Sequence, residues 1–139
     1  MEKPSRSELR KIIMTILYQK SIYEKNKINF TIDNLISSAL EIDNEFVKDT
    51  VYGVITYQNE IDKLINKYLN NWTIDRLGYT DQAIMRMAIY ELEYTDTPKI
   101  VCINEAVELA KSYSDDDVRK MINASLDRLY HDIENNESK

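Results

Sequence analysis

Residues 80–94 encode a helix with apolar side chains on most of its circumference. At about 100° per residue, only Gln82, Arg86 and Glu93 share a narrow polar edge. Such a helix must be covered by protein on most sides, because exposing apolar surface to water is unfavourable. We therefore expect a central helix over about residues 80–94, with the remaining elements packed around it.

Apolar residues recur at helical spacing along almost the whole chain, which indicates an all-α fold, a compact multi-helix bundle. The other helices are expected over about residues 5–24, 31–40, 44–68, 103–111 and 114–134. Two Gly and two Pro among 139 residues leave little turn chemistry for hairpins. We expect one domain over residues 1–134 and a frayed polar tail at residues 135–139.

Three positions lead to specific structural expectations. Gly53 lies inside the expected helix 44–68, where it costs about 1 kcal/mol relative to Ala, and a close helix crossing would explain it. Trp72 is expected to plug the base of the bundle together with Ile74 and Leu77. Ser114 is expected to cap the last helix, with three carboxylates following it at the positive end of the helix dipole.

Composition restricts the class of protein. Hydrophobic residues make up 43% of the chain and charged residues 30%, as in soluble globular domains. No aliphatic run approaches the roughly 20 residues that a membrane span needs, and the charged N-terminus is unlike a secretory signal. We therefore expect a cytoplasmic protein that does not enter a membrane. Cys102, between Val101 and Ile103, is expected to be a small core residue.

Nothing in the sequence indicates catalysis, a cofactor or a metal. No nucleophile–base arrangement, phosphate loop or metal-ligand spacing is present. Glu105, Glu108 and Lys111 drift around a helix surface, and the last two form an ordinary surface pair. The run of acidic residues at 115–117 suits a helix start better than a cation site. The sequence therefore predicts a protein that is not an enzyme.

Charge is distributed unevenly along the chain. Residues 1–27 carry seven Lys or Arg against three Glu, a net charge of +4, whereas the rest of the chain carries −10. A basic segment on an acidic body indicates a local anionic partner. The alternative is an ordinary solvated first helix.

The first helix places an aromatic residue among cations. With its apolar stripe centred on Leu9 and Ile13, Tyr18 projects about 180° away, and Lys11 lies within about 20° of Tyr18. Arg10 lies roughly 80° off on the same flank, and Arg6 one turn before it. This combination is typical of single-stranded RNA binding, in which cations follow phosphates and a ring stacks on a base. The alternative is that Tyr18 packs on a neighbouring helix.

Two sequence motifs are similar to those of a known family. Residues 85–92, Met-Arg-Met-Ala-Ile-Tyr-Glu-Leu, and residues 103–111, Ile-Asn-Glu-Ala-Val-Glu-Leu-Ala-Lys, resemble the NusB family of bacterial transcription antitermination factors. The resemblance covers essentially the whole chain and is strongest between Leu64 and Asp127. It implies an RNA-binding factor that binds boxA-type single-stranded RNA together with NusE, a small-subunit ribosomal protein. It also implies a place in the RNA polymerase antitermination complex, chiefly in ribosomal RNA operons.

The resemblance implies two RNA-contacting regions. In the first, Arg6, Arg10 and Tyr18 match the family and Lys11 lies beside them, while Glu8 stands where many members are basic. In the second, at the start of the last helix, the implied residues are Asp117, Lys120 and Met121. Met121 replaces an aromatic residue and therefore removes one stacking surface.

The face that binds NusE is expected on the polar edge of the central helix, at Asp81, Gln82, Arg86 and Glu93. An acidic body suits a basic ribosomal partner. The alternatives for this edge are ordinary solvation or an internal Arg86 salt bridge.

Two other functions are compatible with the sequence. The chain is alternatively a stand-alone relative of the NusB-like domain of ribosomal RNA methyltransferases, although it has no cofactor-binding motif. It is alternatively a helical protein-binding adaptor that has lost RNA affinity, as Glu8 and Met121 suggest. Family members occur as monomers and as homodimers, and the sequence leaves a homodimer open.

Overall fold

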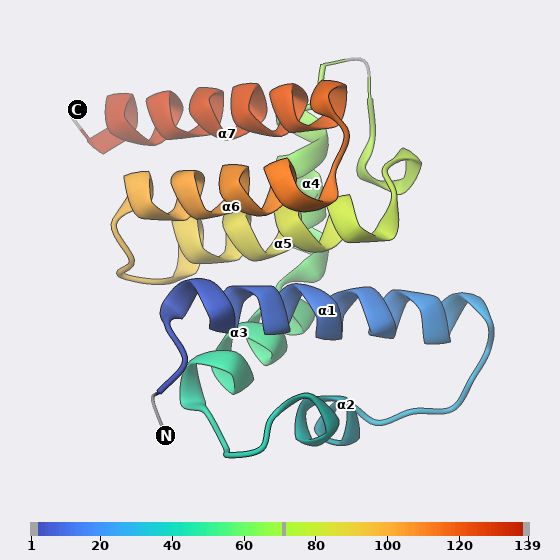
Figure 1. The fold of residues 1–139 in the computed structure, drawn as a ribbon. Coiled ribbons are helices and arrows are strands. Elements are labelled where there is room, and N and C mark those ends of the chain that lie inside the picture. The colour runs from blue at the N-terminus through green and yellow to red at the C-terminus, as the bar shows by residue number, and fades with distance from the viewer. Residues whose placement is uncertain (1–2, 71, 138–139) are drawn as a thin grey trace.

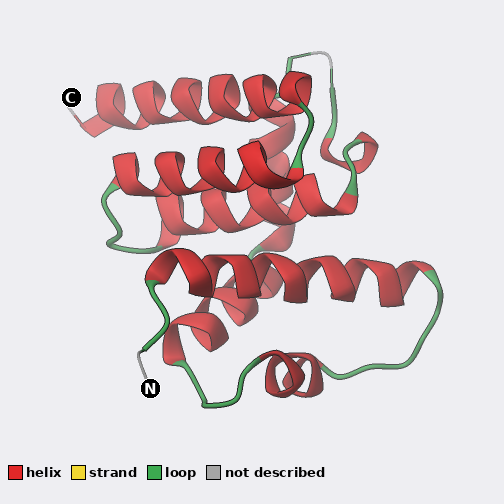
Figure 2. Cartoon of the chain, viewed as in Figure 1, coloured by secondary structure: helices red, strands yellow, loops and turns green. Residues whose placement is uncertain are grey.

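The computed structural model describes residues 3–70 and 72–137, and within them every regular element is helical (Figure 2). The α-helices are α1 (Arg6–Lys25), α2 (Ile32–Ala39), α3 (Glu45–Thr56), α4 (Gln58–Tyr68), α5 (Tyr79–Tyr94), α6 (Lys99–Tyr113) and α7 (Asp116–Glu137). A short 3-10 helix, η1 (Ile74–Arg76), precedes α5. The all-α prediction is confirmed. None of these helices combines the length and apolarity that crossing a bilayer requires.

The predicted central helix is α5. It packs against α1, α3, α4, α6 and α7, so it has neighbours on nearly every side. In Figure 1, α1 runs below α5 and α6, and α7 lies above α6. Helices α3 and α4 lie behind these helices. Nine of its 16 residues are buried. This enclosure follows from its nearly continuous apolar surface, which water would otherwise contact.

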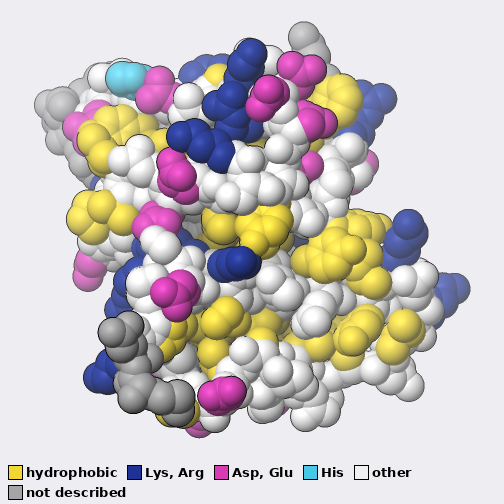
Figure 3. Space-filling model, viewed as in Figure 1, with side chains coloured by type: hydrophobic (Ala, Val, Ile, Leu, Met, Phe, Trp, Pro, Cys, Tyr) yellow, Lys and Arg dark blue, Asp and Glu magenta, His cyan; other side chains and the backbone are white. Residues whose placement is uncertain are grey.

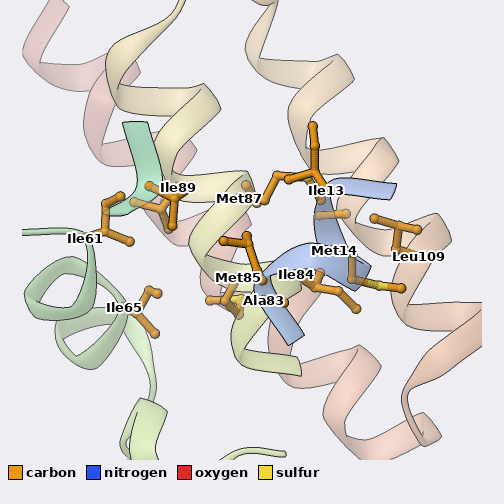
Figure 4. Close-up of a cluster of buried hydrophobic side chains, with 14 of the residues drawn as sticks. Ile13, Met14, Ile61, Ile65, Ala83, Ile84, Met85, Met87, Ile89 and Leu109 are labelled. Atoms are coloured by element: carbon orange, nitrogen blue, oxygen red, sulfur yellow. The ribbon is translucent and has the colours of Figure 1, made fainter. Parts of the chain in front are cut away.

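The core is built from the apolar stripes of several helices around α5. Figure 4 shows Ile13 and Met14 from α1, Ile61 and Ile65 from α4, and Leu109 from α6 lying around the α5 side chains. Ile13, Ile61 and Ile65 have no exposed surface. Burying a side chain of this size contributes roughly 1.5–3 kcal/mol, so this cluster supplies much of the driving force for folding.

One long helix was expected over residues 44–68, and this expectation is wrong. The chain turns at Tyr57, whose φ of −104° and ψ of 15° separate α3 from α4. The physical reason is packing: α3 contacts α1 and α5, whereas α4 contacts α5 and α7. A straight helix would carry the second half of the apolar stripe away from its neighbours.

Gly53 lies at a close crossing of α3 and α5, in agreement with the expectation. A Cβ atom at this position would overlap the ring of Tyr90. The absence of a side chain therefore lets the Tyr90 ring pass directly over the α3 backbone, which offsets the low helix propensity of glycine.

The expectation for Trp72 is wrong. Its side chain is 41% exposed and lies near the Arg76 guanidinium, 5.4 Å from the ring centroid, whereas Ile74 and Leu77 are buried as expected. A single short 3-10 turn carries the two aliphatic side chains inward, and the bulkier indole remains at the surface.

The last helix also differs at both ends. Asp115, not Ser114, accepts the capping hydrogen bond from the Val118 amide, at 2.9 Å. Ser114 instead donates its hydroxyl to Asp81 on α5. The helix continues to Glu137, beyond the expected boundary at residue 134, while residues 138–139 lie outside the described part of the chain.

Candidate nucleic-acid interface

The exposed face of α1 carries Tyr18 and Lys11. The helix begins after Ser5, whose hydroxyl accepts the Glu8 amide at 3.1 Å. Burial of Leu9, Ile13 and Ile16 on the inner side leaves Lys11 exposed and Tyr18 40% exposed on the outer side. These two residues are seven positions apart, which places them on one face, two turns from each other.

Tyr113 at the end of α6 joins this face. The Lys11 Nζ lies 5.7 Å from the centroid of the Tyr113 ring, and Tyr113 is 43% exposed. A hydrogen bond with the Tyr113 phenol is the main cause that raises the pKa of Lys11. Tyr113 was not predicted from the sequence; the available signal was an aromatic residue three positions before the start of the last helix.

We call Lys11, Tyr18 and Tyr113 the α1–α6 surface. Figure 3 shows hydrophobic side chains and a Lys or Arg side chain along the line where α1 meets the helices above it. An open groove at this junction is lined by Ser7, Glu8, Lys11, Asn104, Glu105, Glu108, Leu109, Ser112 and Tyr113. Of its three glutamates, Glu105 is paired with Arg10 and Glu108 with Lys111. Glu8 therefore carries the main uncompensated negative charge of this groove, which opposes an anion on that side.

Arg10 does not belong to this surface, because it is buried, which contradicts the expectation that it lies exposed on the flank of Tyr18. Its side chain is 4% exposed and binds Glu91 of α5 in a bidentate pair, at 2.7 Å from Nε and 2.8 Å from Nη2. Glu105 of α6 lies 3.5 Å from Nη1. The Glu91 hydrogen bond is the main cause that raises the pKa of Arg10. The guanidinium therefore joins three helices inside the molecule.

Arg6 is exposed, but its side chain contacts α3, whereas the Lys11 side chain contacts α6. Its guanidinium lies 4.0 Å from the centroid of the Phe46 ring on α3. It lines a second depression, which also includes Leu40 and Ile42 of the loop after α2. The structure therefore places Arg6 on the α3 side of α1 and Lys11 on the α6 side.

The second predicted region, at the start of α7, is partly at the surface. Asp117 and Lys120 are exposed, and α7 begins three residues after Tyr113. Met121 is half-buried and packs against the core, which limits the surface that it presents to a ligand. An apolar side chain at this point of the helix gains more from burial than from exposure.

The polar edge of α5 is largely used within the molecule. Gln82 is buried and donates to the Leu77 carbonyl at 3.0 Å, which corrects its prediction as an exposed contact. Arg86 forms a bidentate pair with Asp62 of α4, at 2.9 and 3.0 Å, which is the internal salt bridge considered as the alternative. Burial is the main cause that raises the pKa of Asp81, which accepts a hydrogen bond from Ser114. Glu93 is exposed.

Metal-ligating side chains do not gather in the described residues. No cluster of three or more His, Cys, Asp or Glu side chains suitable for a metal ion occurs there. Cys102 is buried, and burial is the main cause that raises the pKa of its thiol to about 12. Such a thiol is protonated at neutral pH and is a poor nucleophile.

The structure thus defines a class of small all-helical protein in which α5 is enclosed by the other helices. The α1–α6 surface exposes two tyrosine rings and the Lys11 ammonium. Residues 7–131 match the model of the NusB family. The chain belongs to the NusB family.

Curated relatives and solved structures agree with this assignment. Transcription antitermination protein NusB of Halalkalibacterium halodurans is 41% identical over 113 residues, 78% of this chain and 84% of that protein. The NusB protein of Staphylococcus aureus strain JH9 is 40% identical over 126 residues, 90% of this chain and 98% of that protein. T. maritima NusB superimposes with a TM-score of 0.77 at 30% identity, covering 91% of each chain.

A further similar structure is a crystal structure of the antitermination factors NusB and NusE in complex with double-stranded RNA. It has a TM-score of 0.77 and 25% sequence identity, and the match covers 91% of this chain and 96% of that one.

Proposed function

We propose that the protein is an RNA-binding transcription antitermination factor that binds boxA-type RNA together with NusE, within the RNA polymerase antitermination complex. The α1–α6 surface is the observation that carries this proposal, because it presents two rings and a cation together. The relatives named as transcription antitermination proteins and the similar NusB–NusE–RNA structure support it.

Each group on this surface has a distinct part in the proposed complex. Tyr18 and Tyr113 offer ring faces on which unpaired bases stack, and Lys11 between the two helices contacts a phosphate. In this proposal Lys120, exposed at the start of α7, contacts a further phosphate, and Arg6 contacts another on the α3 side of α1. Glu8 in the groove opposes the strand on its own side.

NusE is the proposed protein partner, and Glu93 is the proposed contact on its docking face. Of the four residues predicted for it, Glu93 is exposed and Asp81 is half-buried, whereas Gln82 is buried and Arg86 is paired with Asp62. An exposed carboxylate such as that of Glu93 attracts a basic ribosomal protein. This attraction mainly accelerates association.

The first test measures RNA affinity by fluorescence anisotropy of a labelled boxA-type RNA, with and without NusE, at two salt concentrations. We expect binding that tightens with NusE and weakens with salt, because phosphate contacts release counterions. Tyr18→Ala should weaken RNA binding by about 1–3 kcal/mol, the contribution of one stacked base. A duplex of the same sequence shows whether the strand must be unpaired.

Trp72→Ala is the matched control, because Trp72 has the same exposure as Tyr18 but lies next to η1. It should leave RNA affinity unchanged, and circular dichroism should give the same helix content for both variants. Equal RNA affinity of wild type and Tyr18→Ala would remove Tyr18 from the interface.

A second candidate is a protein-binding adaptor that has lost RNA affinity. Glu8 in the groove and the half-buried Met121 favour it, because one repels phosphate and the other offers no ring. The same titration, together with NusE binding measured separately by isothermal titration calorimetry, distinguishes the two functions. NusE binding without any salt-sensitive RNA binding would establish the adaptor.

A further inference from the structure

Three tyrosines form a stack where the α3–α4 junction meets the C-terminal half of α5. The rings of Tyr57 and Tyr94 lie face to face, with centroids 4.2 Å apart and an interplanar angle of 10°. Tyr90 continues the arrangement, 5.7 Å from Tyr94 at 22°. Tyr57 and Tyr94 remain 40% and 38% exposed, so much of the ring surface is open to solvent.

Carboxylates surround this tyrosine stack. Glu60 follows Tyr57 by one turn of α4, Glu93 precedes Tyr94 on α5, and Asp49 lies on α3; all three are exposed. Burial, followed by the negative charges of Glu60 and Glu93, raises the pKa of Tyr94. In the described part of the chain none of the three carboxylates is in an ion pair. The stack therefore lies in a negative potential.

We propose that the tyrosine stack and its three carboxylates bind an arginine side chain of a protein partner. A guanidinium stacks on an aromatic face by cation–π attraction, and its fork of donors fits carboxylates in a bidentate way. The same carboxylates repel phosphate, so a nucleic acid is a poor occupant. No residue of the stack belongs to the α1–α6 surface, so the site is separate from the proposed RNA binding. It shares Glu93 with the face proposed for NusE, and to that extent it rests on the proposed function.

The ring positions are fixed before any ligand binds, which favours recognition. The glycine at position 53 admits Tyr90 against the α3 backbone, and the turn at Tyr57 brings that ring over Tyr94. A preformed stack loses little side-chain entropy when an arginine docks. The partner segment must present an exposed arginine with few acidic neighbours, because the site is itself acidic.

The test uses a short amidated peptide with two arginines separated by glycine, titrated into the ¹⁵N-labelled full-length protein and followed by two-dimensional NMR. We expect saturable shifts confined to residues around Tyr57, Glu60 and Glu93. A peptide with citrulline in place of arginine keeps the shape without the charge, and it should not bind. A lysine peptide should bind more weakly than the arginine peptide, because an ammonium lacks the planar fork.

Tyr94→Leu keeps apolar bulk but removes the ring, and should weaken peptide binding about two- to fivefold, whereas Tyr94→Phe keeps the ring and should bind almost as wild type. Glu60→Gln should weaken binding and flatten its salt dependence. Trp72→Ala, which removes an exposed ring elsewhere, should have no effect. Thermal unfolding by circular dichroism verifies that each variant is folded.

Absence of saturable shifts with the arginine peptide, or equal binding by Tyr94→Leu and Tyr94→Phe, would overturn the proposal. Analytical ultracentrifugation supplies an independent outcome: self-association that Tyr94→Leu abolishes, without peptide binding, would assign the stack to a second copy of the chain instead.

Discussion

Arg10 lies at the centre of a buried ion network. Its guanidinium is enclosed by Glu91 on α5 and Glu105 on α6, and Glu105 also accepts the Ser7 hydroxyl at 2.7 Å. Both Glu residues belong to the motifs that indicated the family. Their acidic character therefore serves an internal ion network that fixes the N-terminal half of α1 against α5 and α6.

We expect Arg10→Met to lower the free energy of unfolding by about 3–5 kcal/mol, because it leaves the buried Glu91 carboxylate without its cationic partner and with only the weak Cys102 thiol contact. Urea unfolding followed by circular dichroism measures this loss. The double variant Arg10→Met/Glu91→Met should recover most of it, since the remaining charge is then also removed. A single variant as stable as the wild type would mean that the pair contributes nothing.

Lys11, one residue later, should behave in the opposite way. Lys11→Gln removes an exposed charge from the α1–α6 surface, so stability should hardly change. The slope of log affinity for single-stranded RNA against log salt should become shallower by about 0.7, because one phosphate contact is lost. An unchanged slope in the anisotropy titration would place Lys11 outside the phosphate path.

At the scale of elements, the turn between α3 and α4 lets both helices pack against α5. The Tyr57 amide bonds back to the carbonyls of Gly53 and Ile55, which closes α3, and α4 begins at the next residue. Both helices then direct their apolar sides toward α5. The glycine and the turn act together, because the same close approach seats Tyr90 and positions Tyr57.

Gly53→Ala should destabilise the protein by about 1–3 kcal/mol, although alanine is the better helix former, because its methyl group overlaps the Tyr90 ring. In a Tyr90→Ala background, the same substitution should instead stabilise by up to about 1 kcal/mol, the difference in helix propensity. Chemical denaturation of the four proteins measures this change of sign. The same sign in both backgrounds would show that the ring does not restrict position 53.

At the scale of the whole molecule, the buried side chains of Cys102 and Tyr68 make the free energy of unfolding depend on pH in the alkaline range. Burial is the main cause that raises the pKa of Cys102 from 9.0 to about 12 and that of Tyr68 from 10.0 to about 12. The folded protein therefore keeps these protons at a pH where the unfolded chain has already released them. The free energy of unfolding is highest below the unfolded pKa values and falls as pH rises from 9 towards 12.

Urea midpoints should accordingly be lower at about pH 10.5 than at about pH 8. The decrease should be smaller for Cys102→Ala, which removes one of the two groups, although this variant also leaves a small cavity. A thiol reagent at neutral pH should react with Cys102 only after unfolding, because the thiol is buried and protonated. Rapid labelling of the folded protein would contradict this assignment.

The charge distribution is another property of the whole molecule, and the fold modifies what the sequence indicated. Seven cations occur in residues 1–27, but Arg10 is buried and Lys20 pairs with Glu24 at 2.9 Å. The basic segment is therefore less available to an anionic partner than its net charge of +4 indicates. Lys11 and Arg6 remain exposed, on two flanks of α1.

Most of the fold was predictable from the spacing of apolar residues alone. The all-α class and the central position of α5 both followed from periodicity, because a helix repeats its faces at a fixed angle whatever its neighbours are. The outward direction of Tyr18 followed for the same reason. The sequence also contained the family motifs, which made RNA and NusE the proposed partners.

The tertiary structure decided which neighbour each face meets. Periodicity places Arg10 on the flank of α1, but only the approach of Glu91 and Glu105 turns that flank into a buried ion network. The break at Tyr57, the exposure of Trp72 and the meeting of Lys11 with Tyr113 likewise depend on residues distant in the chain. A sequence determines the angle at which a side chain leaves its helix, whereas burial and charge pairing depend on what packs against it.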